Sequence, residues 1–185
     1  MAIQLILILA AAAIALMWMV ASFNGMVALR NRVHNAWSEI DVQLKRRHDL
    51  IPNLVESVRG YMQHERSTFE SVTQARVQAI SAGNNVQQRS LAESALSSAL
   101  GNLFAVVENY PQLHASENVE LLQEQLTSTE NRIAFARQFY NDEVAKYNTM
   151  QSTFPRNLFA RLLGFSPAVM FAGTDAERAN VPVKI

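Results

Sequence analysis

Residues 3–23 read IQLILILAAAAIALMWMVASF, and this stretch decides the placement of the whole chain. Only Gln4 and Ser22 are distinctly polar within it. A helix of this length is about 31 Å long, which matches the hydrocarbon core of a bilayer. The sequence therefore predicts a transmembrane anchor over residues 1–23.

A cleaved signal peptide is the alternative interpretation of this stretch. Val20 and Ala21 lie near a small-residue site of the kind at which signal peptides are removed. A signal peptide also carries a basic segment ahead of its apolar core, and residues 1–4 contain no Lys or Arg. An uncleaved anchor is therefore the favoured interpretation.

Positive charges lie on one side of the predicted span. None precedes it, and those that follow it first are Arg30, Arg32, Lys45, Arg46 and Arg47. The flank richer in Lys and Arg tends to stay in the cytoplasm. We therefore expect the N-terminus outside and the rest of the chain in the cytoplasm.

Composition argues against several kinds of function. The 16 basic residues balance the 16 acidic ones, so no basic stripe exists for nucleic acid. Cysteine is absent, and no two of the four histidines (His34, His48, His64 and His114) lie three or four residues apart, as a helical metal site needs. We expect no metal, no cofactor and no nucleic-acid partner, and we interpret His48 and His64 as solvated or capping residues.

Apolar residues recur at spacings of three and four along residues 26–81, as in a helix packed against other helices. They are Val33, Trp37, Ile40, Leu44, Ile51, Leu54, Val58, Tyr61, Val72, Ala75 and Ala79. Asp49 suits an N-cap, and Pro52 is costly within a helix but tolerated in a first turn. We predict a break near Asp49. A kinked continuous helix is the alternative, because the apolar register runs on through Pro52.

Two more helices follow a loop over residues 81–85. The first carries its apolar face on Leu91, Ala95, Ala99 and Leu103 and ends before Pro111, and the second runs from Val119 to about Phe154, before Pro155. Long helices with short connections predict an all-α, antiparallel up-and-down bundle, four-helix in arrangement, over residues 24–171. Residues 172–185 form a polar C-terminal tail.

Two polar blocks, residues 37–47 and 130–142, supply the candidate site. The candidates are Asp41, Arg46, Arg47, Glu130, Arg137, Asn141 and Asp142. Arg47 falls on the apolar register, and burying it unpaired would cost several kcal/mol. Either it pairs inside the bundle with Glu130 or Asp142, or these residues form a recognition face for another protein.

The apolar segment near the C-terminus is interrupted by Pro155, Gly164 and Pro167, so it predicts a short amphipathic helix or an apolar clasp. Its candidate membrane or partner contacts are Leu158, Phe159, Leu162, Phe165 and Phe171. The alternative is that the segment simply covers one end of the bundle.

Residues 30–56, RNRVHNAWSEIDVQLKRRHDLIPNLVE, resemble the N-terminal signature of the LemA family. Further matches are residues 60–61, 64–65, 129–133, 136–138, 140–141, 147–148 and 155–171. The resemblance implies a single-pass protein of the bacterial inner (cytoplasmic) membrane with a cytoplasmic four-helix bundle, which favours the break near Asp49. It also suggests TPM-domain proteins or a membrane metalloprotease as partners. It supplies no catalytic residue, because no enzymatic activity is established for the family.

The residues alone show no nucleophile elbow, phosphate loop or catalytic dyad. We therefore expect a non-catalytic membrane-anchored scaffold or adaptor that forms a homo-oligomer and binds other membrane proteins. Small residues at 10–13 and 15 allow membrane helices to approach closely. The alternatives are an accessory subunit of a membrane protease or envelope-stress system, and a ligand sensor or enzyme that uses an internal polar pocket.

Overall fold

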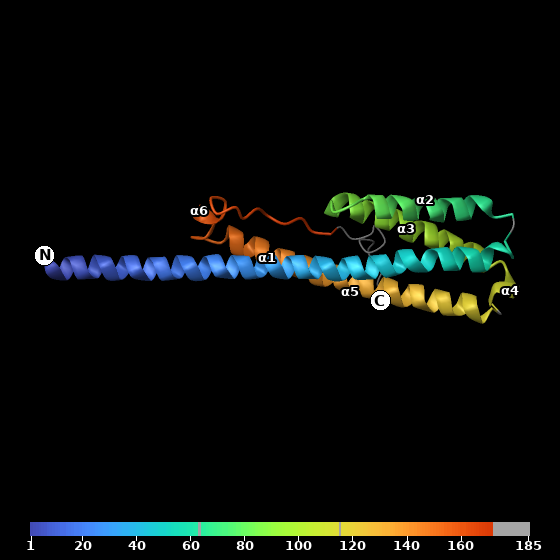
Figure 1. The fold of residues 1–185 in the computed structure, drawn as a ribbon, viewed down its shortest axis with the longest axis horizontal. Helices are drawn as coiled ribbons and strands as arrows, with labels where there is room; N and C mark the ends of the chain where they lie inside the picture. The colour runs from blue at the N-terminus through green and yellow to red at the C-terminus, as the bar shows by residue number, and fades with distance from the viewer. Residues whose placement is uncertain (63, 115, 172–185) are drawn as a thin grey trace, which may run out of the picture. The chain divides into compact units, whose positions relative to one another are not determined.

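The computed structural model describes residues 1–62, 64–114 and 116–171. Within these ranges it contains helices and no strand, which confirms the predicted all-α class. The longer helices are α1 Ala2–Arg59, α2 Arg66–Ser81, α3 Val86–Val107 and α5 Glu117–Ser152, and the single-turn helices are α4 Pro111–His114 and α6 Asn157–Ala160 (Figure 1).

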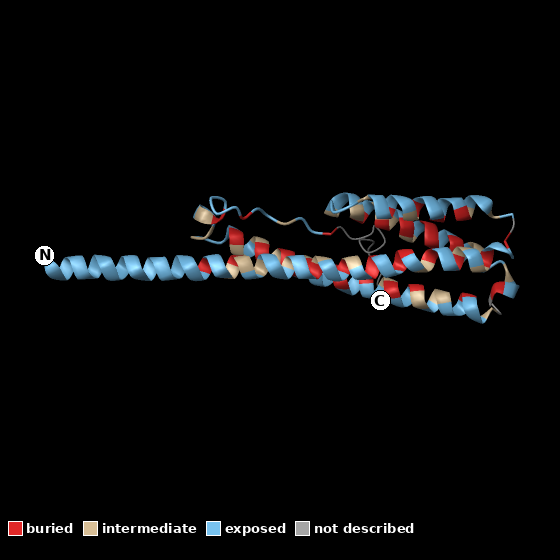
Figure 2. Cartoon of the chain, viewed as in Figure 1, coloured by how far each residue is buried: buried red, intermediate tan, exposed pale blue. Residues whose placement is uncertain are grey.

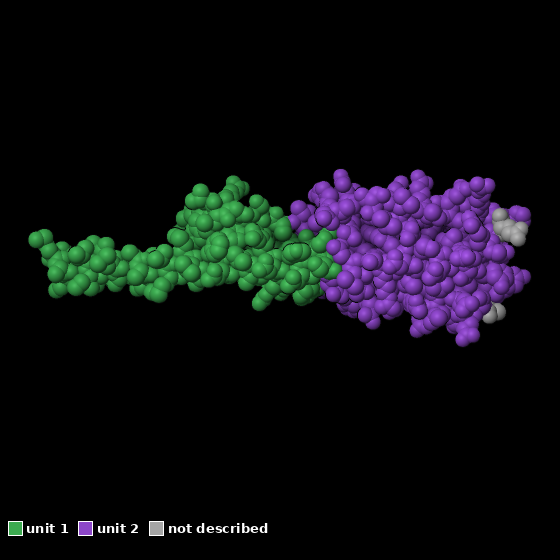
Figure 3. Space-filling model, viewed as in Figure 1, with its two compact units in different colours: residues 1–38, 139–168 green, residues 39–138, 169–185 purple. Residues whose placement is uncertain are grey.

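The chain divides into two compact units, and the division falls inside α1 and inside α5 (Figure 3). Unit 1 contains residues 1–38 and 139–168, and unit 2 contains residues 39–138 and the chain from residue 169 onward. α1 and α5 therefore each contribute to two separate cores.

Unit 1 begins with a bare helix. Every residue of α1 up to Ala21 is exposed (Figure 2), and this stretch is apolar and long enough to cross a membrane. The first buried residue of α1 is Ser22, and the small core of the unit consists of Met26, Tyr147, Ala160 and Phe165. An apolar helix that the protein itself leaves uncovered is what a membrane anchor requires.

Unit 2 is a bundle in which α2 and α3 pack together and the chain runs back and forth from helix to helix (Figure 1). Its core is aliphatic apart from Phe69, and the fully buried members include Leu54, Val58, Met62, Val72, Leu96, Leu103 and Leu113. α3 is also long and apolar enough to pass a membrane-span test. Because α3 supplies five core residues and a buried glutamate, we assign it to the bundle core.

The predicted break near Asp49 is wrong. α1 continues through Pro52 and ends only at Arg59, so the break between the first two helices lies about ten residues later, before α2 begins at Arg66. On both sides of Pro52 the apolar register is buried, at Leu44, Ile51 and Leu54. Ending the helix at Asp49 would have taken these side chains out of one continuous seam.

The helix tolerates Pro52 because a distant side chain replaces the missing donor. Proline has no N–H, so the His48 carbonyl one turn earlier loses its usual intrahelical partner. The Arg76 Nε on α2 donates a hydrogen bond to this carbonyl oxygen at 2.7 Å. The sequence around Asp49 contains no sign of this donor, which lies 28 residues away.

Candidate functional site

Unit 2 contains an ionic cluster around Arg47, which is only 1% exposed. Its Nη1 donates to Glu130 Oε2 on α5 at 2.5 Å and to Ser97 Oγ on α3 at 2.9 Å, and its Nη2 donates to the Glu93 carboxylate, also on α3. One guanidinium thus ties together three helices. Its planar fork suits this task because it can serve two carboxylates at once.

His48 extends the cluster from the next position of α1. Its Nε2 lies 2.9 Å from Glu93 Oε1, and both side chains are buried. Burial alone raises the pKa of Glu93, but the hydrogen bond from His48 and the positive charge of Arg47 outweigh burial and leave that pKa below its ordinary value. Glu93 is therefore an anion at neutral pH.

The cluster has a defined charge balance. Two carboxylates, Glu93 and Glu130, face one guanidinium and one imidazole. The charges cancel when His48 is protonated and leave one excess negative charge when it is neutral. Glu130 has 45% of its side chain exposed, so water screens that end of the cluster.

A second ion pair of unit 2 joins Asp41 Oδ1 on α1 to Arg89 Nη1 on α3 at 2.6 Å. Arg137 of α5 is also buried, and its guanidinium lies 5.1 Å from the centre of the Phe171 ring. The first contact links α1 to α3, as the Arg47 cluster does, and the second holds the chain at Phe171 against α5.

The structure brings together some of the predicted site residues. Arg47 pairs with Glu130, which was one of the alternatives that the sequence left open, and Asp41 is engaged with Arg89 in the same unit. Arg46 is exposed, and Asn141 and Asp142 belong to the other unit.

Two members of the cluster were missed by the sequence analysis. Glu93 did not appear among the candidates, and the interpretation of His48 as solvated or capping is wrong, since it is 6% exposed. The apolar face assigned to this helix was also wrong in its first half, because Leu91 is 72% exposed while Glu93, Leu96 and Leu100 are buried. The regular spacing of Glu93, Leu96, Leu100, Leu103 and Val107 was the signal that could have found it.

A cleft of about 280 Å³ borders the cluster. Arg47, Ser97 and Glu130 are among its lining residues, and Gly101 leaves open space where a side chain would project. Across the described ranges, no three His, Asp or Glu gather as a metal ion would require. The charged groups of the cluster pair with one another across α1, α3 and α5.

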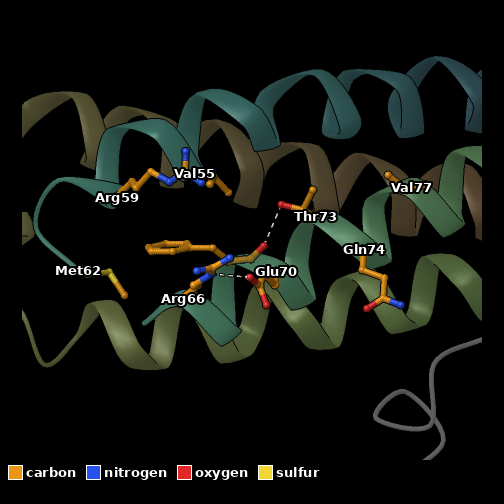
Figure 4. A pocket seen from close by; sticks show the side chains of 9 residues that line it. Val55, Arg59, Met62, Arg66, Glu70, Thr73, Gln74 and Val77 are labelled. Atoms are coloured by element: carbon orange, nitrogen blue, oxygen red, sulfur yellow. Dashed lines mark hydrogen bonds and ion pairs between the residues drawn. The ribbon is translucent and has the colours of Figure 1, made fainter. Parts of the chain in front are cut away.

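A larger groove of about 830 Å³ lies between the end of α1 and α2, and Figure 4 shows its lining. Val55, Met62 and Phe69 contribute apolar surface. Arg59 and Arg66 add positive charge, although Arg66 Nε is paired with Glu70 at 2.7 Å. The sequence analysis did not single out this groove, because it combines residues of two helices with no distinctive motif.

The candidate contact residues near the C-terminus fall into two groups. Leu158 and Leu162 are 71% and 88% exposed, and Phe159 is half-buried. Phe165 and Phe171 are 2% and 3% exposed. The latter two therefore pack inside their units, as the covering interpretation expects, and are not presented to a membrane or partner in this structure.

An apolar N-terminal helix of membrane-spanning length, followed by a helical bundle with a buried ionic centre, defines the structural class. The sequence profile of the LemA family matches residues 36–185, so the chain belongs to the LemA family, as its motifs predicted. It is 26% identical over 174 residues to "Magnetosome protein MamQ 2" of Paramagnetospirillum magneticum and 24% identical to "Magnetosome protein MamQ" of Magnetospirillum gryphiswaldense.

Coverage differs among these relatives. Both MamQ alignments include 80% of this chain and 64% of the relative, so the chain spans less than two thirds of those proteins. "Protein LemA" of Metamycoplasma hominis is 26% identical over 158 residues, which are 85% of this chain and 72% of that protein.

Proposed function

We propose that this protein is a non-catalytic, membrane-anchored helical scaffold that self-associates and binds other proteins at the inner membrane. The observation that carries the proposal is the pairing of Arg47 with Glu93 and Glu130. The groups best suited to chemistry are engaged with one another across three helices and thereby fix the bundle. An accessory subunit of a membrane protease or envelope-stress system is a special case, with the protease or another envelope protein as the partner.

The bare apolar start of α1 supports anchoring, and the basic residues that follow it favour a cytoplasmic bundle. Alkaline phosphatase fused after the last residue should be inactive, and a fluorescent protein at the same place should be bright. Strong phosphatase activity with a dark fluorescent fusion would contradict this topology while leaving the anchor in place.

The groove between α1 and α2 supports partner binding, because its apolar lining with arginines at the edge suits a helix that presents apolar and acidic side chains. Val77 lines the groove and is 53% exposed. Val77→Glu should remove partners recovered by cross-linking the full chain in cells. Ile80→Glu is the matched control, since Ile80 is 52% exposed on α2 outside the groove lining. Equal recovery with both variants would exclude the groove.

Self-association is supported by an exposed aromatic side chain on α5 of unit 2. Phe135 is 72% exposed there. Mass photometry of full-length protein in detergent should show oligomers that Phe135→Ser weakens. Leu121→Ser, at a 50% exposed position of α5, should leave them intact. A strictly monomeric wild type would contradict the scaffold proposal and favour an adaptor that binds its partner one to one.

A ligand sensor is the second candidate, and the 280 Å³ cleft beside Arg47 and Glu130 is the observation that favours it. Gly101→Leu would occupy this cleft, because nothing lies within 4 Å of the added Cβ position. If small polar metabolites raise the melting temperature of the wild type and not of Gly101→Leu, the sensor becomes the better proposal. The absence of any such shift would favour the scaffold.

A further inference from the structure

Unit 1 places the α6 segment against the predicted anchor. The Phe159 ring lies 6.0 Å from the Trp18 ring in an edge-on arrangement, and the Arg156 guanidinium lies 5.8 Å from the centre of the same indole. Phe165 packs on Phe23 at 5.5 Å between ring centres. Residues from the far end of the sequence thus contact the last turns of the apolar stretch.

These contacts set the depth of α6 in a membrane. Trp18 precedes Phe23, the end of the apolar stretch, by five residues, or about 8 Å along a helix. If residues 3–23 span the hydrocarbon core, side chains beside Trp18 lie about 8 Å inside its edge. The apolar face of an interfacial amphipathic helix reaches this depth.

Large apolar side chains of the same segment point away from the protein. Phe154, Leu158 and Leu162 are 74%, 71% and 88% exposed. In water these side chains would form an unfavourable surface, whereas at the depth of Trp18 they meet lipid. The span and this segment therefore offer one continuous apolar surface.

Charge in this region has a single sign. Residues 1–38 and 144–168 contain no Asp or Glu, and their basic side chains are Arg30, Arg32, Lys146, Arg156 and Arg161. Lys146 is paired with Glu143, and Arg30 lies over the Phe165 ring. Arg161 is exposed and makes no ion pair with any described residue. An arginine beside the exposed apolar side chains of Phe154, Leu158 and Leu162 can bind the phosphate of an anionic lipid.

A groove lies beside these apolar side chains within unit 1, and the α6 segment forms part of its lining. It has a volume of about 590 Å³ and is lined by Ser152, Asn157 and Arg161, with Asn148, Gln151 and Pro167 among its walls. Hydroxyl, amide and guanidinium groups together suit a phosphodiester and a polyol headgroup. Asn148 and Gln151 are occupied by bonds to the backbone of Ala168 and Phe165, so they form the wall.

We propose that residues 154–163 form a membrane-interface site for acidic phospholipid, with Leu158 and Leu162 among the acyl chains and Arg156 and Arg161 at the phosphates. The inference rests on the proposed anchoring by α1. It assigns the exposed side of α6 to the membrane and not to a protein partner.

Depth measurement in nanodiscs tests whether Leu158 and Leu162 lie among the acyl chains. The chain has no cysteine, so Leu158→Cys and Leu162→Cys each give a single site for a nitroxide label. Both labels should be more accessible to oxygen than to a water-soluble nickel reagent. Leu91→Cys is the matched control, because Leu91 is 72% exposed on α3 of unit 2, and its label should show the opposite preference.

A label at Leu9 separates two kinds of failure. If Leu9→Cys is in lipid while Leu158 and Leu162 are as water-accessible as Leu91, the interface site is wrong and the anchor stands. If the Leu9 label is also in water, the anchoring on which the inference rests is wrong.

Lipid selectivity tests whether the arginines of this segment bind the phosphates of acidic phospholipid. Native mass spectrometry of full-length protein from equal phosphatidylglycerol and phosphatidylcholine should show phosphatidylglycerol retained preferentially. Arg161→Gln should lower this preference about fivefold, as expected for one arginine at an anionic surface. Arg132→Gln, an exposed arginine of unit 2, should leave it unchanged. Equal retention of the two lipids by the wild type would overturn the proposed headgroup class.

Discussion

The two units hold α1 and α5 together by different chemistry. Unit 2 uses an aliphatic core with a buried ionic cluster, in which Arg47 connects Glu93 and Glu130. Unit 1 uses aromatic rings and a returning segment, in which the Tyr147 hydroxyl donates to the Ser166 carbonyl at 3.1 Å. Ionic pairing fixes one helix register and responds to pH, whereas aromatic packing tolerates shifts and does not titrate near neutrality.

Intrinsic fluorescence distinguishes the units. The only tryptophans, Trp18 and Trp37, both belong to unit 1. Tryptophan emission therefore reports unit 1, while circular dichroism reports the helices of both.

The largest effect is expected from Arg47→Ala. It leaves Glu93 and Glu130 without their shared cation and should cost about 3 to 5 kcal/mol in urea unfolding, as for other broken buried pairs. The neighbouring Arg46→Ala is the control, because Arg46 is exposed and should change stability by less than about 0.5 kcal/mol. Equal losses in the free energy of unfolding for both variants would show that the buried cluster stabilises the bundle no more than an exposed arginine does.

Trp37→Ala should have the next largest effect. The indole is half-buried and lies 5.4 Å from the Tyr140 ring, so its loss should cost about 2 kcal/mol, less than for a fully buried tryptophan. Circular dichroism should show an unfolding transition displaced toward lower urea. An unchanged midpoint would mean that the contact with Tyr140 is replaceable.

Arg76→Ala tests the donor that accompanies Pro52. Without Arg76 Nε the His48 carbonyl loses a hydrogen bond, and we expect a cost of about 1 to 2 kcal/mol. In the Pro52→Ala background an intrahelical N–H is available again, so the same substitution should cost clearly less. Equal costs in both backgrounds would show that Arg76 stabilises the bundle by another route.

The smallest effect is expected from mild acid. The pKa of Glu93 is lowered on folding, so its contribution is complete above the unfolded value of about 4.3 and is lost as pH falls through the folded value. Stability should therefore fall below about pH 4.3, and less steeply in Glu93→Gln. A wild type and a Glu93→Gln variant with the same slope would assign acid sensitivity to other carboxylates.

The sequence predicted features that depend on one helix or on strong chemical complementarity. The length and composition of residues 3–23 favoured an anchor over a cleaved signal peptide. The position of Arg47 on an apolar seam indicated a carboxylate partner as one of two interpretations, and Glu130 supplies that carboxylate. The continuity of α1 through Pro52 was not predictable locally, because the replacement donor Arg76 comes from another helix. Glu93 was missed because the helical register around it had been assigned to the face that carries Leu91.

The contact between the α6 segment and the apolar start of α1 was not predictable from the sequence, for a similar reason. The exposed members of this segment, Leu158 and Leu162, were recognised by composition, but the contact of Phe159 with Trp18 joins opposite ends of the sequence. Periodicity describes faces of single helices and gives no information on which distant ring lies against which.

The substituted hydrogen bond at Pro52 also determines how α1 would respond to tension. A helix carries axial load through its ladder of hydrogen bonds, and the rung between residues 48 and 52 is missing from that ladder. The neighbouring hydrogen bonds of that turn would carry the load together with the Arg76 side chain, which passes part of it to α2. A pull transmitted along α1 would therefore reach its yield point at this turn, where the first bond to rupture joins two helices instead of two turns of one.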